Sequence, residues 1–99
     1  MGRFTVYRNP DNAGYLLDLQ AEINSHFETR VVAPLLPIAD VPHYAISLNP
    51  VFDIEGARYV MATQGLAAVP VRILKQQVLS LEHKQAEIVA AIDLLFQGF

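Results

Sequence analysis

The chain has 99 residues, a formal charge of −3 and no cysteine, and only 17% of its residues are charged. This length fits one domain over residues 1–99, and the lack of cysteine excludes a disulfide scaffold and thiolate chemistry. The acidic balance and the scattered basic residues disfavour direct binding of nucleic acid, because proteins that grip phosphates gather lysine and arginine on one face.

The first part of the chain reads as two strands joined by a long loop. Residues 4–7 and 15–20 alternate apolar and polar side chains, and the segment between them is rich in turn-forming residues. This pattern predicts a hairpin. In its second strand, Asp18 and Gln20 are expected on a solvated face.

The next segment loses its periodicity and then becomes apolar. Residues 21–29 are interpreted as a loop or a helical turn that displays Ile23 and Asn24. Residues 30–36 predict a strand buried on both faces, with a bulge or an edge position near Pro34, which has no N–H to donate.

The second half predicts more strands and no strand–helix–strand alternation. Residues 37–50 carry three prolines and are expected to be ordered but irregular. Residues 51–63 predict a hairpin around Gly56, and residues 69–74 predict a final strand that a short connection joins to the helix. About five or six strands followed by one helix favour an antiparallel α+β fold or a small barrel closed by a helix.

The last twenty residues, Ser80–Phe99, predict one amphipathic helix and a short tail. Ser80 is the expected N-cap, and Gly98 is expected to end the helix and let Phe99 leave in a new direction. An apolar stripe is predicted to face the core; it contains Leu81, Ile88, Val89, Ile92, Leu95 and Phe96.

The opposite face of this helix carries fewer charges than a solvated face usually does; its residues are Ala86, Ala90, Asp93, Leu94 and Gln97. One hypothesis is that this face and the tail meet a partner or a second subunit. The other is that the alanines are present for helix propensity alone. The low overall charge and the 53% of apolar residues also favour a homodimer.

The sequence shows no pattern of an enzyme site. His26, His43 and His83 lack the spacing of a metal site, and no glycine-rich loop or nucleophile arrangement appears, so we expect no catalytic residue, metal or cofactor. The chain has no N-terminal signal and no long apolar run, which predicts a cytoplasmic protein without a membrane span.

The order and spacing of several motifs resemble the CcdB family of plasmid-type toxins over nearly the whole chain. The motifs are Phe4-Thr5-Val6-Tyr7, Leu17-Asp18-Leu19-Gln20, Arg30-Val31-Val32-Ala33-Pro34-Leu35, Val69-Pro70-Val71 and Ala91-Ile92-Asp93-Leu94-Leu95-Phe96-Gln97-Gly98-Phe99.

The resemblance implies a five-stranded antiparallel sheet with a small accessory sheet and a C-terminal helix, in an arrangement related to MazF ribonucleases and SH3-like barrels. It implies the toxin of a type II toxin–antitoxin system, which as a homodimer binds the gyrase A subunit and traps gyrase on cleaved DNA. It also implies a cognate antitoxin, similar to CcdA, that neutralises the toxin, and repression of the operon by the toxin–antitoxin pair.

By the same resemblance, the contact with gyrase falls on the C-terminal tail and on one loop; the residues are Gln97, Gly98, Phe99, Asp93, Ile23 and Asn24. The best-known member has tryptophan where this chain has Gln97. Two alternatives remain: an endoribonuclease similar to MazF, which shares the architecture, and an inactive relative of CcdB.

Overall fold

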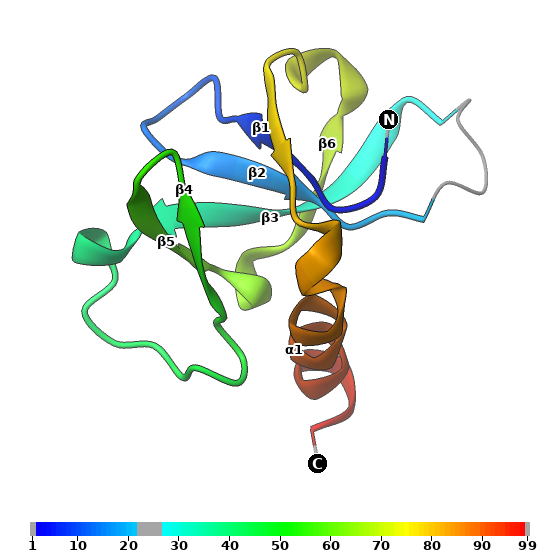
Figure 1. Ribbon diagram of the computed structural model, residues 1–99. Helices are drawn as coiled ribbons and strands as arrows, with labels where there is room; N and C mark the ends of the chain where they lie inside the picture. Colours follow the sequence, from blue (N-terminus) through cyan, green and yellow to red (C-terminus); the bar gives the residue numbers. More distant parts are fainter. Residues whose placement is uncertain (1, 22–26, 99) are drawn as a thin grey trace.

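The computed structural model describes residues 2–21 and 27–98, which form one curled antiparallel sheet and one helix (Figure 1). The strands are β1 (Thr5–Arg8), β2 (Tyr15–Asp18), β3 (Thr29–Pro37), β4 (Val51–Ile54), β5 (Ala57–Met61), β6 (Ala67–Pro70) and β7 (Gln77–Ser80), and the helix is α1 (Gln85–Gln97). Short 3-10 turns cover Ile38–Asp40, Thr63–Gly65, Val71–Ile73 and Glu82–Lys84.

The α+β class and the C-terminal helix are confirmed, and the strand count is higher than expected. The described residues form seven strands in one sheet of order β4-β5-β3-β2-β1-β7, with β6 also paired to β3. The sequence predicted five or six strands, and the resemblance implied a separate accessory sheet. The additional strand is β7, which lies in the segment that was expected only to connect to the helix.

Strand β3 organises this sheet because it changes neighbours along its length. One edge pairs with β2, while the other pairs first with β6, at Thr29–Val32, and then with β5, at Leu35–Pro37. Leu19 N–H donates to Val31 O, and the alternation of an antiparallel ladder then points the nitrogen of Pro34 away from β2. Pro34, which has no N–H to donate, therefore lies where β3 stops pairing with β6 and begins to pair with β5. This change of partner is the irregularity that the sequence predicted near Pro34.

Both faces of β2 are buried, which corrects the expectation of a solvated face at Asp18. The main core lies on one face of the sheet, and a second cluster of Tyr7, Leu16, Val32 and Leu74 covers the other. Asp18 is fully buried and forms an ion pair with buried Arg30 at 2.9 Å. The guanidinium also donates to Gln20 O at 2.7 Å. The alternation of polar and apolar residues along β2 could not reveal this ion pair, because Arg30 lies on the neighbouring strand β3.

The β4–β5 hairpin is confirmed, and its turn is tied to the β1–β2 hairpin. Glu55 and Gly56 both have positive φ, 51° and 85°, as a two-residue turn of this kind requires. The Tyr15 hydroxyl donates to Glu55 Oε1 at 2.5 Å, and Arg8 pairs with the same carboxylate at 2.8 Å. Burial, helped by this hydrogen bond, raises the pKa of Tyr15 to about 12, and the hydrogen bond from Tyr15 lowers the pKa of Glu55.

The segment between β6 and α1 differs from its prediction. A strand was expected over residues 69–74, but β6 ends at Pro70 and a 3-10 turn covers Val71–Ile73. The apolar residues of this segment still face the sheet, since Leu74 belongs to the second cluster and Val69 and Ile73 pack against it.

Phe4 joins the first strand to the start of the helix. Its N–H donates to Asp18 O at 2.6 Å, and its carbonyl accepts from Leu81 N–H at 2.8 Å. The residue is buried, and its φ of 70° lies in the left-handed region. Such a conformation costs about 1–3 kcal/mol in a residue other than glycine, and here the two backbone bonds and the burial of the ring hold it in place.

The buried ion pair predicts a large effect of Asp18→Asn. This change leaves the Arg30 charge buried without a countercharge, which should lower the free energy of unfolding by about 3–5 kcal/mol in urea denaturation. The matched control is Asp53→Asn, since Asp53 faces Arg58 at 3.7 Å in a highly exposed pair, and exposed pairs contribute little. Equal losses in the two variants would contradict this assignment.

The raised pKa of Tyr15 predicts a loss of stability at high pH. An unfolded tyrosine ionises near pH 10, whereas folded Tyr15 keeps its proton until about pH 12. Its contribution is therefore fully present below about pH 10 and is lost as the pH rises to about 12. Urea denaturation across this window should show a smaller decline in Tyr15→Phe than in the wild type. A decline of the same slope in both would show that Tyr15 does not cause it.

Candidate functional site

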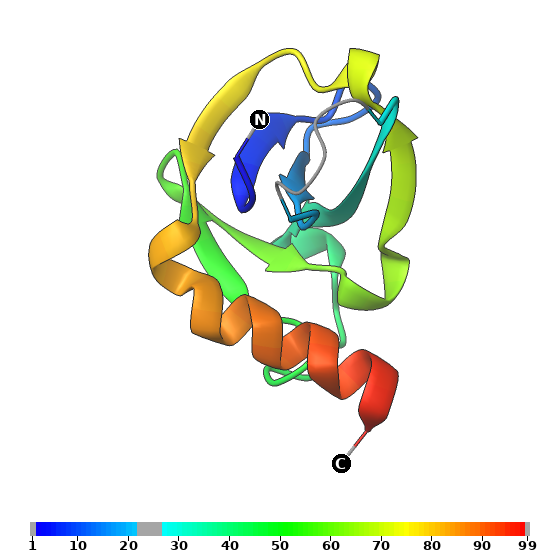
Figure 2. The same ribbon diagram turned by 90° about the vertical axis from the view of Figure 1, so that its right-hand side faces the viewer.

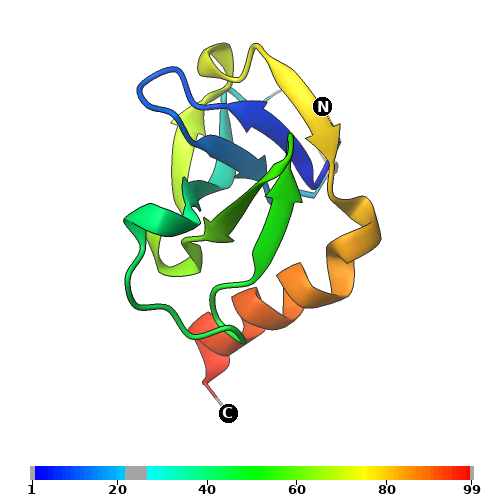
Figure 3. The same ribbon diagram turned by 60° about the vertical axis from the view of Figure 1, so that its left-hand side comes forward.

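The candidate site is the C-terminal end of α1, which lies at the edge of the molecule in all three views (Figures 1, 2 and 3). The helix is held against the sheet by Ile88 and Ala91, which are fully buried, while Val89 and Ile92 pack partly on the same core. Most of the predicted apolar stripe thus faces the core. The middle of α1 is therefore anchored to the sheet, and the last turn extends from this anchored part.

The helix begins later than its sequence predicts. Ser80 is the last residue of β7, and α1 starts at Gln85 after the turn Glu82–Lys84. Ser80 Oγ still accepts from Glu82 N–H, at 3.1 Å. The predicted cap therefore serves the turn that leads into the helix. Leu81, which is buried, fixes this turn to the core and to Phe4.

The helix ends as predicted, on a glycine with positive φ. Gly98 has a φ of 70°, and its N–H donates to Leu94 O at 3.0 Å. Among the described residues, apart from its chain neighbours, no atom lies within 4 Å of the position where a Cβ of residue 98 would stand, so the backbone conformation, rather than lack of space, favours glycine here.

Phe96 does not face the core, which corrects the prediction that placed it on the apolar stripe. Its side chain is 70% exposed, because the last turn of α1 extends beyond the residues that bury Ile88 and Ala91. Sequence reasoning therefore left out an aromatic candidate contact. The signal for it was present: an aromatic residue more than one turn beyond the last buried position, next to the glycine that ends the helix.

Three of the six predicted contact residues lie together on this exposed end. Asp93 and Gln97 are one turn apart on α1, Gly98 follows, and all three are exposed. With Phe96 they form what we call the C-terminal surface. Ile23, Asn24 and Phe99 lie outside the residues that the structure describes. The segments on either side of residues 22–26 stand toward the other end of the molecule from this surface (Figures 1 and 2).

The outer face of the helix is exposed along most of its length, as its composition suggested. Ala86, Ala90, Asp93 and Gln97 are all exposed, and Leu94 is half-buried. Small side chains at this spacing let another surface approach the helix closely. This arrangement fits the partner hypothesis and leaves the helix-propensity explanation of the alanines open.

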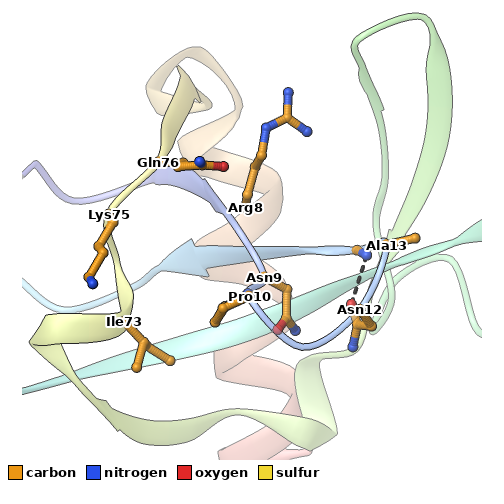
Figure 4. Close-up of a pocket in the computed structure, with 9 residues that line it drawn as sticks. Arg8, Asn9, Pro10, Asn12, Ala13, Ile73, Lys75 and Gln76 are labelled. Atoms are coloured by element: carbon orange, nitrogen blue, oxygen red, sulfur yellow. Dashed lines mark hydrogen bonds between the residues drawn. The ribbon is translucent and has the colours of Figure 1, made fainter.

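A separate hollow of about 420 Å³ lies beside the β1–β2 loop (Figure 4). Asn9, Asn12 and Arg8 line one side, and Lys75 and Gln76 line the other. The asparagines are engaged within the loop, since Asn12 Oδ1 accepts from Gly14 N–H at 2.7 Å and Asn9 Oδ1 accepts from Asp11 N–H at 2.9 Å. None of the predicted contact residues that the structure describes, which are Asp93, Gln97 and Gly98, lines this hollow.

The described residues hold neither a metal-binding cluster nor a membrane-spanning helix. No three side chains of the metal-binding types gather into a group that could hold a metal ion over residues 2–21 and 27–98. Within the same ranges, no helix has the length and apolar character needed to cross a membrane.

Comparison with protein families matches residues 3–98 to the family described as CcdB protein. The chain belongs to the CcdB family. This match covers almost the whole chain and confirms the resemblance drawn from the sequence motifs. The family is one of toxins of toxin–antitoxin systems.

The unequal burial along α1 predicts that its two halves respond differently to truncation of a side chain. Ile88→Ala should lower the free energy of unfolding by about 2–5 kcal/mol, because it leaves a cavity in the core. Phe96→Ala should change it by less than about 0.5 kcal/mol, because the ring is mostly solvated. Chemical denaturation of both variants measures the difference. A large loss in Phe96→Ala would mean that the ring is buried in solution.

Proposed function

We propose that this protein is a toxin that binds the A subunit of DNA gyrase and traps gyrase on cleaved DNA. Membership of the CcdB family supports the class of target. The observation that carries the proposal is the C-terminal surface, which leaves a phenylalanine 70% exposed on a helix that is anchored by fully buried residues. Exposed aromatic side chains on a rigid base are typical anchors of protein interfaces.

In this proposal the contact with gyrase consists of the tail and one loop; its residues are Asp93, Phe96, Gln97, Gly98 and Phe99, with Ile23 and Asn24. Phe96 is added to the residues that the sequence indicated. Because Gln97 lacks the stacking surface of an aromatic side chain, Phe96 and Phe99 supply the apolar contact area of the tail. The protein acts by binding and cuts no DNA itself.

The protein acts in the cytoplasm as a homodimer, and a cognate antitoxin similar to CcdA neutralises it. The exposed ring of Phe27, which is 58% accessible in the single chain, supports association with a second copy. The toxin–antitoxin pair represses its own operon. Because the chain is acidic, we assign the contact with operator DNA to the antitoxin.

The proposal predicts that the tail is needed for toxicity but not for folding. A chain that ends at Phe96 and the variant Phe96→Ala should each lose most of the inhibition of gyrase supercoiling, the accumulation of cleaved plasmid and the arrest of growth. The exposed residue Gln85, at the other end of the same helix, gives the control variant Gln85→Ala. Circular dichroism and thermal unfolding show whether each variant is folded.

Equal inhibition by the full chain and by a folded chain without residues 97–99 would contradict the proposed contact. Incubation of the purified protein with single-stranded RNA in the absence of gyrase tests the ribonuclease alternative. Cleavage that persists in the purified chain and needs no gyrase would replace the proposed function.

A further inference from the structure

The hollow beside the β1–β2 loop has two walls that come from distant parts of the chain (Figure 4). One wall is the loop itself, and the other is the segment before β7, which contributes Ile73, Lys75 and Gln76. Its volume of about 420 Å³ lies within the range of sites for small molecules. The loop and the C-terminal surface stand at opposite ends of the molecule (Figures 1 and 3). The hollow is therefore separate from the contact proposed with gyrase.

Hydrogen bonds within the β1–β2 loop hold the first wall in one shape. Asn9 N–H donates to Gly14 O at 3.1 Å and closes the loop. A Cβ at residue 14 would stand 2.5 Å from Leu35 O, so glycine lets this end of the loop lie against β3. The Oδ1 atoms of Asn9 and Asn12 accept from backbone N–H groups of the loop, which leaves the NH2 groups of both side chains to donate. The wall is preformed and rich in donors.

A bulge between β1 and β7 shapes the second wall. The register of the two strands shifts between Val6 and Tyr7, where β7 carries one extra residue. Just beyond the bulge, Arg8 N–H donates to Gln76 O at 2.9 Å. Bulges give side chains new directions and are frequent beside binding sites. Here the bulge and this hydrogen bond fix the backbone from which residues 75 and 76 reach the hollow.

The charge of the hollow is positive, because Arg8 and Lys75 are its ionisable lining residues. The Arg8 guanidinium is already paired with Glu55, at 2.8 Å. Lys75 forms no ion pair within residues 2–21 and 27–98. Asp11 belongs to the same loop but does not line the hollow. The ammonium group of Lys75 is thus available for an anion from outside the chain.

Hollows elsewhere on the described chain differ in this respect, because each places a carboxylate beside its cation. The pairs are Glu87 with Lys84, Asp53 with Lys84 and Glu28 with Arg72. An anionic ligand would meet a like charge in any of them. Charge complementarity therefore favours the hollow at Lys75.

Apolar groups decide which kind of anion fits. Pro10 and Ala13 line the hollow from the loop, and Ile73 lines it from the opposite wall. Ile73 is held in place because it packs against the second cluster. An inorganic anion would leave this apolar surface uncovered, whereas an organic acid can cover it. Apolar walls with a few polar groups are typical of sites for small molecules.

We propose that this hollow binds a small carboxylic acid with an apolar body. The carboxylate binds Lys75 Nζ, and the apolar body packs against Pro10 and Ile73. The NH2 groups of Asn9 and Asn12 can donate to any further oxygen of the acid. The bound acid bridges the β1–β2 loop and the segment before β7.

The test uses the isotope-labelled full chain and matched pairs of compounds. The acids are phenylacetate, hexanoate and isovalerate, and each is compared with its primary amide, which keeps the apolar body and has no charge. Each compound is added up to about 10 mM, because ligands of this size bind weakly. Binding is followed through the chemical shifts of the backbone amides.

Three variants separate the charge of the site from the charge of the whole chain. Lys75→Gln removes the ammonium group, and Lys75→Arg keeps a positive charge at the same place. Lys84→Gln removes an equal charge at the start of α1 and serves as the control. Because Lys75 is exposed, its variants should fold like the wild type, which thermal unfolding verifies.

At least one acid should shift the amides of Asn9, Asn12, Lys75 and Gln76 and leave those of α1 unchanged. Its dissociation constant should rise about five-fold or more in Lys75→Gln, and the matched amide should bind the wild type about five-fold or more weakly. Lys75→Arg and Lys84→Gln should bind the acid within about two-fold of the wild type.

Three results would overturn the proposal. One is that none of the acids shifts any amide. Another is equal binding of an acid and its amide, or equal binding of the acid by the wild type and by Lys75→Gln. The third is a set of shifts outside residues 8–14 and 73–76, since this would place the acid in a different hollow.

Discussion

The structure depends on a change of partners along β3. This strand of nine residues is the only described element that pairs with three others, and the switch from β6 to β5 lies at Pro34, whose ring nitrogen has no hydrogen to donate. Pro34 O accepts from Ala62 N–H, and Ala62 O in turn accepts from Gly65 N–H, so the carbonyl that an N–H at position 34 would face already has a donor. The proline thus allows the sheet to split along one edge and curl, and the curl encloses the main core.

The curl has two consequences for function. It provides the apolar surface on which Ile88 and Ala91 hold α1, so the helix has a fixed direction while its last turn reaches beyond the core and leaves Phe96 in solvent. It also brings β4 and β7 close without joining them, which leaves an open seam. One constraint in the middle of the chain therefore sets both the direction of α1 and the position of the open seam.

Local signals in the sequence predicted much of the fold. The β4–β5 hairpin could be predicted because Gly56 marks a turn that needs positive φ, and the helix because its apolar residues recur at helical spacing. The burial of Asp18 could not be predicted from local signals, since its partner Arg30 lies on another strand. Part of the C-terminal surface was predicted by resemblance, but Phe96 was assigned to the core, because periodicity does not report where the sheet ends beneath a helix.

The pairing of β1 with β7 also constrains how the protein is made. Thr5 lies opposite Ser80, and the strained backbone of Phe4 is held by Asp18 on one side and Leu81 on the other. During synthesis, β1 can pair early with β2, but its other edge stays unpaired until β7 has left the ribosome. The helix that carries the C-terminal surface follows β7 and emerges after it. A prematurely terminated chain therefore lacks the C-terminal surface that we propose as the contact with gyrase.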